Sequence, residues 1–362
     1  MRVLELVLKW GNGGAERYVE DLVLTGIDEG IDCRVASVAT DVRSARIEGC
    51  GPLVSGGVKG ALFGSGTLEL YVRSGAFDFV HVHGNNGLAF KFARVAKKAG
   101  AKAVVHSHNS SFGNGFRGAK GLFTNFERRL ASSGCDGRFA CSRAAGEFLF
   151  PGDPYLIAPN GVDTGRFAFN PESRTGTRVR LGIAGDAPVV GFAASLIDAK
   201  NPLMALEVFE RVAECLPEAR FAICGDGKLS DEVAAAVAAS PMSRHCVRAG
   251  RVADIERYYS AMDVLLAPSK YEGLPINLIE AQANGLPVVM SDAITDEVVV
   301  VPSLCARVPL SATIDEWADA VVNAISKRGR RTEEYAEIVR RAGYSQPECF
   351  QVIFDFYREV LR

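Results

Sequence analysis

The chain has 362 residues, a formal net charge of −2 and a hydrophobic content of 48%. At roughly 100 to 200 residues per domain, this length predicts two domains with separate cores. The near-neutral charge argues against nucleic acid as a partner. No apolar run approaches the ~20 residues of a membrane-spanning helix, so any membrane contact is expected to be peripheral. The nine cysteines lack C-x-x-C spacing and indicate reduced thiols in a cytoplasmic protein.

The first half begins with an apolar strand at residues 3–8, a glycine-rich turn at 11–14 and then apolar residues at helical spacing. Such a turn lets backbone N–H groups approach a phosphate, which makes Gly13 and Gly14 candidate donor contacts. A dinucleotide-binding turn or a plain strand-to-helix connection would fit equally well. Further strands are expected at 33–38, 77–83, 101–108, 138–142 and 155–158. The alternation with helices predicts a parallel sheet covered on both faces.

Four of the five histidines form two H-x-H pairs, each at the carboxyl end of a predicted strand: His81 with His83 and His106 with His108. The two-residue period of a strand places both members of a pair on one face of the sheet. For His81 and His106 we favour packed, hydrogen-bonded core positions. A metal site built from imidazoles is the alternative, but no Asp or Cys ligands accompany them at suitable spacing, so no metal is assigned.

Aromatic and basic residues are interleaved at 110–129, and three cations share one face of the predicted helix before it, Lys91, Arg94 and Lys98. This pattern is compatible with contact to an anionic bilayer and a lipid diphosphate. A solvated basic face over buried phenylalanines explains the same residues.

A P-N-G-V-D turn at 159–163 closes the first half, and we interpret the polar stretch 170–185 as the interdomain linker. A second series of strands is expected at 189–194, 220–224, 246–249, 262–267, 286–290 and 305–308. Apolar residues at helical spacing in 346–361 predict a terminal helix.

The stretch 262–290 is expected to fold as strand, loop, helix and strand. Its carboxylates, Glu272 in the loop and Glu280 eight residues later, can face one crevice. The residues around the expected helix start are Gly273, Leu274, Pro275 and Ile276. Unpaired N–H groups and the helix dipole favour an anion there. The sequence therefore predicts a phosphate at the helix start with one carboxylate on either side.

This E-G-L-P-x-x-x-x-E arrangement resembles the nucleotide-sugar site of glycosyltransferase family 4, and particularly its exopolysaccharide-type group 1 members. These are retaining enzymes of the GT-B fold, in which two Rossmann-like β/α/β domains face a central cleft. The turns at 13–17 and 159–163 match the same family. The resemblance implies an acceptor-binding domain at 1–165, a donor-binding domain at 166–344, and a terminal helix at 345–362 that crosses back to the first domain.

The resemblance also implies roles for individual residues. His108 would lie beside the transferred sugar with His83 as a neighbouring cleft residue, Glu272 would hold the sugar, and Glu280 would accept from the ribose hydroxyls. Lys200 and the helix start would neutralise the diphosphate. Further donor contacts are implied at Gly225, Arg251 and Val252. No D-x-D cluster marks a Mg²⁺ site, so no cofactor is expected beyond the nucleotide-sugar substrate.

One position departs from the family pattern. An arginine that grips the donor diphosphate is replaced here by Ser195, which lacks both the charge and the bidentate fork. Either another arginine substitutes, with Arg17 and Arg251 as candidates, or donor binding is altered.

These observations predict a retaining glycosyltransferase that uses a nucleotide-diphosphate sugar, most simply a UDP-sugar. The acceptor implied by the resemblance is a glycan or a polyprenyl-diphosphate-linked glycan of bacterial exopolysaccharide synthesis, with work at the cytoplasmic face of the membrane. A nucleotide-sugar epimerase of the same fold and a non-catalytic nucleotide-sugar-binding protein remain alternatives. A nicotinamide-dependent oxidoreductase lacks a well-placed acidic residue for the ribose.

Overall fold

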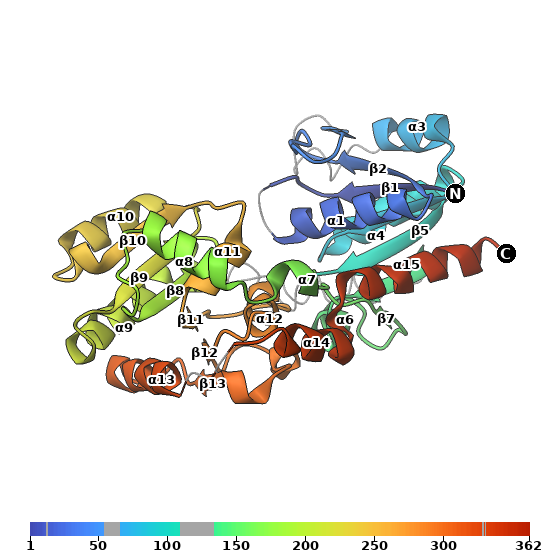
Figure 1. Ribbon diagram of the computed structural model, residues 1–362. Helices are drawn as coiled ribbons and strands as arrows, with labels where there is room; N and C mark the ends of the chain where they lie inside the picture. Colours follow the sequence, from blue (N-terminus) through green and yellow to red (C-terminus); the bar gives the residue numbers. More distant parts are fainter. Residues whose placement is uncertain (12–13, 54–65, 109–133, 328, 330) are drawn as a thin grey trace. The chain divides into compact units, whose positions relative to one another are not determined.

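The protein forms two compact units (Figure 1). The computed structural model describes residues 1–11, 14–53, 66–108, 134–327, 329 and 331–362. Unit 1 consists of Met1–Asn160 and Pro347–Arg362, and unit 2 of Gly161–Gln346. Among the described residues, no helix combines the length and apolar composition needed to cross a membrane.

Unit 1 contains a parallel sheet of seven described strands in the order β3-β2-β1-β4-β5-β6-β7. Its strands are β1 (Arg2–Val7), β2 (Asp32–Ser37), β3 (Gly49–Cys50), β4 (Phe79–His83), β5 (Lys102–Ser107), β6 (Gly137–Ala140) and β7 (Leu156–Ile157). The five strands predicted after residue 30 are present. The apolar residues of β2, β4, β5 and β6 are largely buried, whereas Leu156 and Ile157 of β7, at the edge of the sheet, are exposed. The short strand β3 was not predicted.

Helices cover both faces of this sheet. The described helices of unit 1 are α1 (Gly14–Asp28), α3 (Gly66–Gly75), α4 (Gly87–Lys98), α6 (Arg143–Leu149) and α15 (Gln346–Val360). Alternation along β1 sends Leu4 and Leu6 into a core shared with α3 and α4, and Val3 and Val7 into a core shared with α1 and α15. The terminal helix α15, red in Figure 1, therefore completes the unit that contains the amino terminus, as predicted.

Unit 2 contains a second parallel sheet, with six described strands in the order β10-β9-β8-β11-β12-β13. The strands are β8 (Val189–Ala193), β9 (Arg220–Cys224), β10 (Cys246–Gly250), β11 (Val264–Ala267), β12 (Val288–Ser291) and β13 (Cys305–Val308). Its α-helices are α7 (Thr164–Phe167), α8 (Pro171–Arg180), α9 (Pro202–Cys215), α10 (Ser230–Ala239), α11 (Ile255–Ala261), α12 (Ile276–Ala283), α13 (Ile314–Ser326) and α14 (Glu334–Val339). Both units thus have the predicted Rossmann-like α/β architecture.

The strand orders identify one switch point in each sheet. In unit 1 the chain places β2 on one side of β1 and β4 on the other, and in unit 2 it places β9 and β11 on opposite sides of β8. Open α/β sheets bind ligands beyond the carboxyl ends of the strands at such a point. The loops after β1, β4, β8 and β11 are therefore the first places to look for a site.

The stretch 170–185 is not the interdomain linker that its polar composition suggested. Asn170 accepts from Ser173 N at 2.7 Å and Pro171 occupies the first turn, so the segment starts helix α8 within unit 2. The Arg178 guanidinium is buried and donates to Asp263 Oδ2 at 2.6 Å. The prediction was wrong because it rested on polar composition, which does not reveal that a distant carboxylate pairs with this arginine in the core.

Candidate functional site

The loops after β8 and β11 bring a lysine and a glutamate together at the switch point of unit 2. Lys200 ends a 3-10 turn after β8, and its ammonium contacts the carboxylate of Glu272 in the loop after β11. Both side chains are largely buried, with 19% and 11% exposed. The backbone of Lys270 joins the two loops by donating to Ala199 O at 2.8 Å. The structure therefore unites two predicted site residues from distant parts of the sequence.

Helix α12 starts directly beside this pair. Pro275 was predicted to lie in the first turn of the helix. It is instead the N-cap residue, and the helix begins at Ile276. Asn277 Nδ2 donates to Ala193 O at 3.0 Å, which holds the first turn against the end of β8. Gly273 and Leu274 are buried in the preceding loop. The positive end of α12 is thus fixed at the carboxyl ends of the strands, as an anion site requires.

Glu280 lies further along the same helix and is half-buried. The hydroxyl of Tyr259, on α11, donates to Glu280 Oε2 at 3.1 Å. Tyr259 is almost completely buried, so its phenol is a fixed donor that holds the carboxylate in place.

The loops after β9 and β10 form the other side of this edge. A Cβ on Gly225 would lie 1.9 Å from Ala194 O, and its φ is +154°, so only glycine allows the β9 loop to pack against the β8 loop. Gly225 N donates to Gly250 O at 2.7 Å and links this loop to β10. Immediately after β10, Arg251 is exposed and Val252 is half-buried. The implied role of Gly225 in donor contact is thus accompanied by a packing role.

The region of Ser195 contains a cation that the sequence analysis did not single out. Ser195 is half-buried in the loop after β8. Nearby, Lys270 Nζ lies 2.5 Å from Asp198 Oδ1, in the same turn that ends at Lys200. Of the two candidate substitutes for the family arginine, Arg251 belongs to unit 2. Arg17 belongs to unit 1, where it lies 3.9 Å from Asp21.

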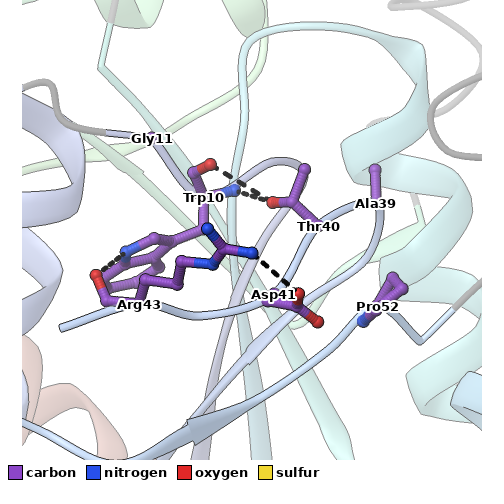
Figure 2. A pocket seen from close by; sticks show the side chains of 7 residues that line it. All are labelled: Trp10, Gly11, Ala39, Thr40, Asp41, Arg43 and Pro52. Atoms are coloured by element: carbon purple, nitrogen blue, oxygen red, sulfur yellow. Dashed lines mark hydrogen bonds and ion pairs between the residues drawn. The ribbon is translucent and has the colours of Figure 1, made fainter.

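In unit 1, the turn after β1 lines a pocket of about 430 Å³ (Figure 2). Its lining residues are Trp10, Gly11, Ala39, Thr40, Asp41, Arg43 and Pro52. The Trp10 indole N–H donates to Arg43 O at 3.0 Å, and Trp10 N donates to Thr40 Oγ1 at 2.7 Å. Of the glycines predicted to contact phosphate, Gly14 is the first residue of α1, and Gly13 lies outside the described residues.

The four paired histidines are buried together beneath α1 and α15. His81 and His106 are fully buried, which confirms their predicted core positions. The predicted hydrogen bond is present for His81, whose Nδ1 lies 2.5 Å from the Tyr357 hydroxyl, whereas neither ring nitrogen of His106 makes a hydrogen bond of good geometry to a described residue. His83 is also buried, with Nε2 2.7 Å from Glu5 Oε2 and Nδ1 2.9 Å from His108 Nε2. Both ring nitrogens of His83 are thus engaged within the buried cluster, and its place in the cleft, expected from the resemblance, stays a prediction. His108 follows β5 and remains 8% exposed.

Glu5 is the member of this cluster that the sequence analysis missed. The signal was present, because one acidic residue interrupts the apolar run V-L-E-L-V of β1. The register pairs Glu5 with His81 on the neighbouring strand, and Glu5 is completely buried. Burial raises its pKa well above the ordinary carboxyl value and lowers the pKa of the four histidines, in the case of His83 to about 3.

The alternative of a metal held by imidazoles would disturb this arrangement. His81, His83 and His106 each offer a ring nitrogen, and these atoms lie within 4.8 Å of one another. However, both nitrogens of His83 already take part in hydrogen bonds. His83 could therefore bind a metal only by giving up one of these contacts.

Two family models match the chain. The model for Glycosyltransferase Family 4 matches residues 12–166, and the model for Glycosyl transferases group 1 matches residues 187–327. EpsF of Bacillus subtilis, provisionally named a glycosyltransferase, is 30% identical over 291 residues, which cover 79% of this chain and 76% of EpsF. An Escherichia coli UDP-Gal:alpha-D-GlcNAc-diphosphoundecaprenol alpha-1,3-galactosyltransferase is 28% identical over 240 residues, covering 62% and 61%.

Solved structures share the whole architecture. A glycosyltransferase from Rickettsia africae matches with a TM-score of 0.78 at 16% identity, over 100% of this chain and 98% of its own. HepE from Anabaena, solved in complex with UDP and glucose, matches with a TM-score of 0.75 at 20% identity, over 98% and 99%. At these identities the likeness establishes the fold, which is GT-B.

Proposed function

The chain belongs to the family 4, group 1 glycosyltransferases, and from this premise we propose that it is a retaining enzyme that moves a sugar from a UDP-sugar to a glycan acceptor. The observation that carries the proposal is the contact between Lys200 and Glu272 beside the start of α12, at the switch point of the unit 2 sheet.

A nucleotide diphosphate has the charge that this position favours. The first-turn N–H groups of α12 and the Lys200 ammonium both attract phosphate oxygens. A diphosphate that engages Lys200 would compete with Glu272 for the ammonium. The Glu272 carboxylate would then accept hydrogen bonds from hydroxyls of the transferred sugar, as the family resemblance implies. The ion pair thus links occupation of the diphosphate site to orientation of the sugar-binding carboxylate.

The spacing of the strands suits the rest of the nucleotide. Neighbouring strands lie about 4.8 Å apart, so the ends of β10 and β11 are separated by roughly 14 Å across the sheet. An extended nucleoside diphosphate can cover this span, with its base near Arg251 and Val252 and its diphosphate at α12. Glu280, held by Tyr259, would accept from the ribose hydroxyls between them.

The charge that Ser195 fails to supply has a candidate source in the same unit. Lys270 lies beside Asp198 at the edge that also presents Lys200. It is two residues from Glu272 and is about 40% exposed, so its ammonium can turn from Asp198 to a phosphate oxygen. We propose Lys270 as the second cation for the diphosphate.

The proposed acceptor is a glycan, free or linked to a polyprenyl diphosphate, in bacterial cell-surface polysaccharide synthesis. Support comes from the Escherichia coli relative, whose name specifies a diphosphoundecaprenol-linked acceptor. In unit 1, the pocket of Figure 2 offers Trp10, Thr40 and Asp41 around a space large enough for a sugar residue. The predicted membrane-contact segment at 110–129 lies outside the described residues.

The proposal is tested by incubating the purified protein with UDP-glucose, UDP-galactose and UDP-N-acetylglucosamine in turn. A donor at 100 times its Kd should stabilise the protein by about 2.7 kcal/mol in a thermal unfolding assay. Transfer to a polyprenyl-diphosphate-linked N-acetylglucosamine should give a product with the anomeric configuration of the donor. Protection by nicotinamide nucleotides alone would refute the proposal. Isomerisation of the donor without an acceptor would identify an epimerase instead.

A further inference from the structure

Five titratable side chains share one face of the unit 1 sheet: Glu5 on β1, His81 and His83 on β4, and His106 and His108 on and just after β5. The register pairs Glu5 with His81 and His83 with His106, so the alternation of each strand sends all five toward the same helices. These helices, α1 and α15, exclude water from the cluster, whose members are 92% or more buried.

Three members of the cluster form a continuous chain of hydrogen bonds. Glu5 Oε2 lies 2.7 Å from His83 Nε2, and His83 Nδ1 lies 2.9 Å from His108 Nε2. At the far end, His108 Nδ1 and Asn160 Oδ1 are both buried, and neither makes a hydrogen bond of good geometry to any described residue. Burial lowers the pKa of His108, and the Asn160 side chain partly opposes this fall, as a group that accepts a hydrogen bond from the ring would do. The chain therefore runs from the middle of the sheet to the edge where β5 ends.

The direction of the protons along this chain follows from counting donors. If Glu5 is ionised, it accepts from His83 Nε2, His83 Nδ1 accepts from His108 Nε2, and His108 Nδ1 is left bare beside the carbonyl of Asn160. That arrangement buries one net negative charge and turns two acceptors toward each other, both of which are costly away from water.

One additional proton removes both costs. Glu5 then donates to His83 Nε2, His83 Nδ1 donates to His108 Nε2, and His108 Nδ1 can donate to Asn160 Oδ1. All four ring nitrogens of His83 and His108 then have a hydrogen-bond partner, and no charge is buried. The directions of the pKa shifts agree with this protonation state, because burial favours the neutral form of the Glu5 carboxyl and of each imidazole.

We infer that Glu5 is a positioning residue. As a neutral carboxylic acid it donates to His83, which in turn donates to His108. This series of hydrogen bonds holds His108 as a neutral imidazole with its proton on Nδ1. Its catalytic significance rests on the proposed function, in which His108 lies beside the transferred sugar. Positive charge develops on that sugar as the diphosphate leaves, and an imidazolium beside it would oppose this charge. A neutral ring of fixed tautomer avoids the repulsion.

Other titratable groups surround the chain and must be considered when its pH response is measured. They are Cys33 on β2, Tyr18 on α1, His81, His106, Cys141, and Cys349 and Tyr357 on α15. Burial raises the pKa of the tyrosines and of Cys33 and Cys349, so these groups also stay neutral near pH 7. The tyrosine on α15 additionally contacts the second oxygen of Glu5 at 3.4 Å.

The tautomer of His108 can be measured in the intact protein without substrate. We expect long-range ¹H–¹⁵N correlations of histidine-labelled protein to show His108 protonated at Nδ1, bare at Nε2 and unchanged from pH 5.5 to 8.5. His108→Gln identifies the signals by their loss. Titration of His108 near its ordinary pKa, or a proton on Nε2, would overturn the inference. So would a stoichiometric transition metal in the purified protein, since the metal would claim these nitrogens.

Two substitutions of Glu5 distinguish its role as a hydrogen-bond donor from any role of a carboxylate charge. The amide of Glu5→Gln can still donate to His83 Nε2, so we expect it to keep the tautomer of His108 and turnover within about threefold of the unsubstituted protein. Glu5→Leu offers no donor, and we expect mixed tautomers and turnover at least about tenfold lower, with UDP-sugar binding retained. Equal impairment of both variants would mean that the carboxylate charge is required and would overturn the inference.

The outcomes remain interpretable if one part fails. Should Glu5→Leu not fold, the tautomer of His108 in Glu5→Gln decides, because loss of the Nδ1 proton there contradicts the chain. If the unsubstituted protein transfers no sugar but shows the expected His108 signals, the proposed function fails while the proton arrangement stands.

Discussion

The phenol of Tyr357, three residues before helix α15 ends, lies 2.5 Å from Nδ1 of His81 on β4. The two residues are 276 positions apart in the sequence. The same phenol contacts Glu5 at 3.4 Å, and its ring is fully buried against Phe79. The terminal helix thus supplies a polar partner to the buried cluster as well as apolar surface.

Replacing Tyr357 by phenylalanine should destabilise unit 1 by about 1 to 3 kcal/mol, because the packing is kept while buried polar atoms lose a partner. Unfolding in urea can be followed by the fluorescence of Trp10, which lies in unit 1, after the other tryptophan is removed as Trp317→Phe. Tyr155→Phe is the matched control, since that hydroxyl makes an exposed hydrogen bond at 3.3 Å. Equal effects of the two changes would contradict a special role for Tyr357.

Lys200→Met should weaken UDP binding by about 10- to 100-fold, because a charge-assisted contact to the diphosphate is lost. Glu272→Gln should behave differently: UDP binding is retained, since Lys200 loses only a competitor, while transfer from the UDP-sugar falls. Isothermal titration with UDP and a turnover assay separate the two effects. Lys327→Met, at an exposed position after α13, is the control. If Lys200→Met bound UDP normally, the diphosphate would have to lie elsewhere.

Glu280→Gln should reduce the affinity for UDP by roughly tenfold, because the amide is a poorer acceptor for ribose hydroxyls. The sharper test compares UDP with 2′-deoxy-UDP. The unsubstituted protein should prefer UDP, and the variant should lose that preference. Tyr259→Phe, which removes the 3.1 Å hydrogen bond to Glu280, should give a smaller effect in the same direction. A preference that survived in Glu280→Gln would assign the ribose to another residue.

Asp263→Ala should destabilise unit 2 by about 3 to 5 kcal/mol, since it leaves a buried guanidinium without its counter-charge. Asp263 is 4% exposed and accepts from Arg178 at 2.6 Å and from Arg174 at 2.8 Å. Trp317 fluorescence reports this unit in the Trp10→Phe background. Asp254→Ala, whose ion pair with Arg180 is 3.6 Å long and partly exposed, should change stability by less than about 1 kcal/mol.

Unit 1 should lose stability on mild acidification. The pKa values of its four buried histidines are lowered, so between pH 7 and 5.5 the unfolded chain takes up protons that the folded unit excludes. This costs roughly 5 kcal/mol in total. The raised pKa of Glu5 acts oppositely, because its stabilising effect is present at low pH and is lost as pH rises, and it offsets roughly 2 kcal/mol.

The expected net loss is therefore roughly 3 kcal/mol by pH 5.5, measured from urea unfolding reported by Trp10. Unit 2, followed by Trp317, serves as the internal comparison, because its single histidine, His245, is half-buried. Unit 1 stability that did not change over this interval would show that the histidines are protonated in the folded state.

Much of the fold could be predicted because it depends on local patterns. Buried parallel strands appear as apolar runs, and the apolar face of α15 appears at helical spacing. The glycine and proline around α12 similarly indicated its start within one residue. Such signals need only a few neighbouring positions, so one sequence is enough to read them.

What could not be predicted depends on contacts between distant positions. Glu5 acquires its meaning only when the register of β1 and β4 places it beside His81. Likewise, Arg178 in the supposed linker becomes a core residue only through Asp263, 85 positions later. The functional roles of His108, Glu272 and Glu280 stay predictions, which the variants above test.

The return of the final helix to the first sheet has a consequence for synthesis. A ribosome completes unit 2 before it releases Pro347–Arg362, yet Phe350, Phe354 and Tyr357 belong to the core of unit 1. Domains generally fold in the order in which they emerge. Here the histidine face of the nascent amino-terminal sheet stays uncovered until α15 has emerged from the ribosome, so unit 2 is the first that can finish folding.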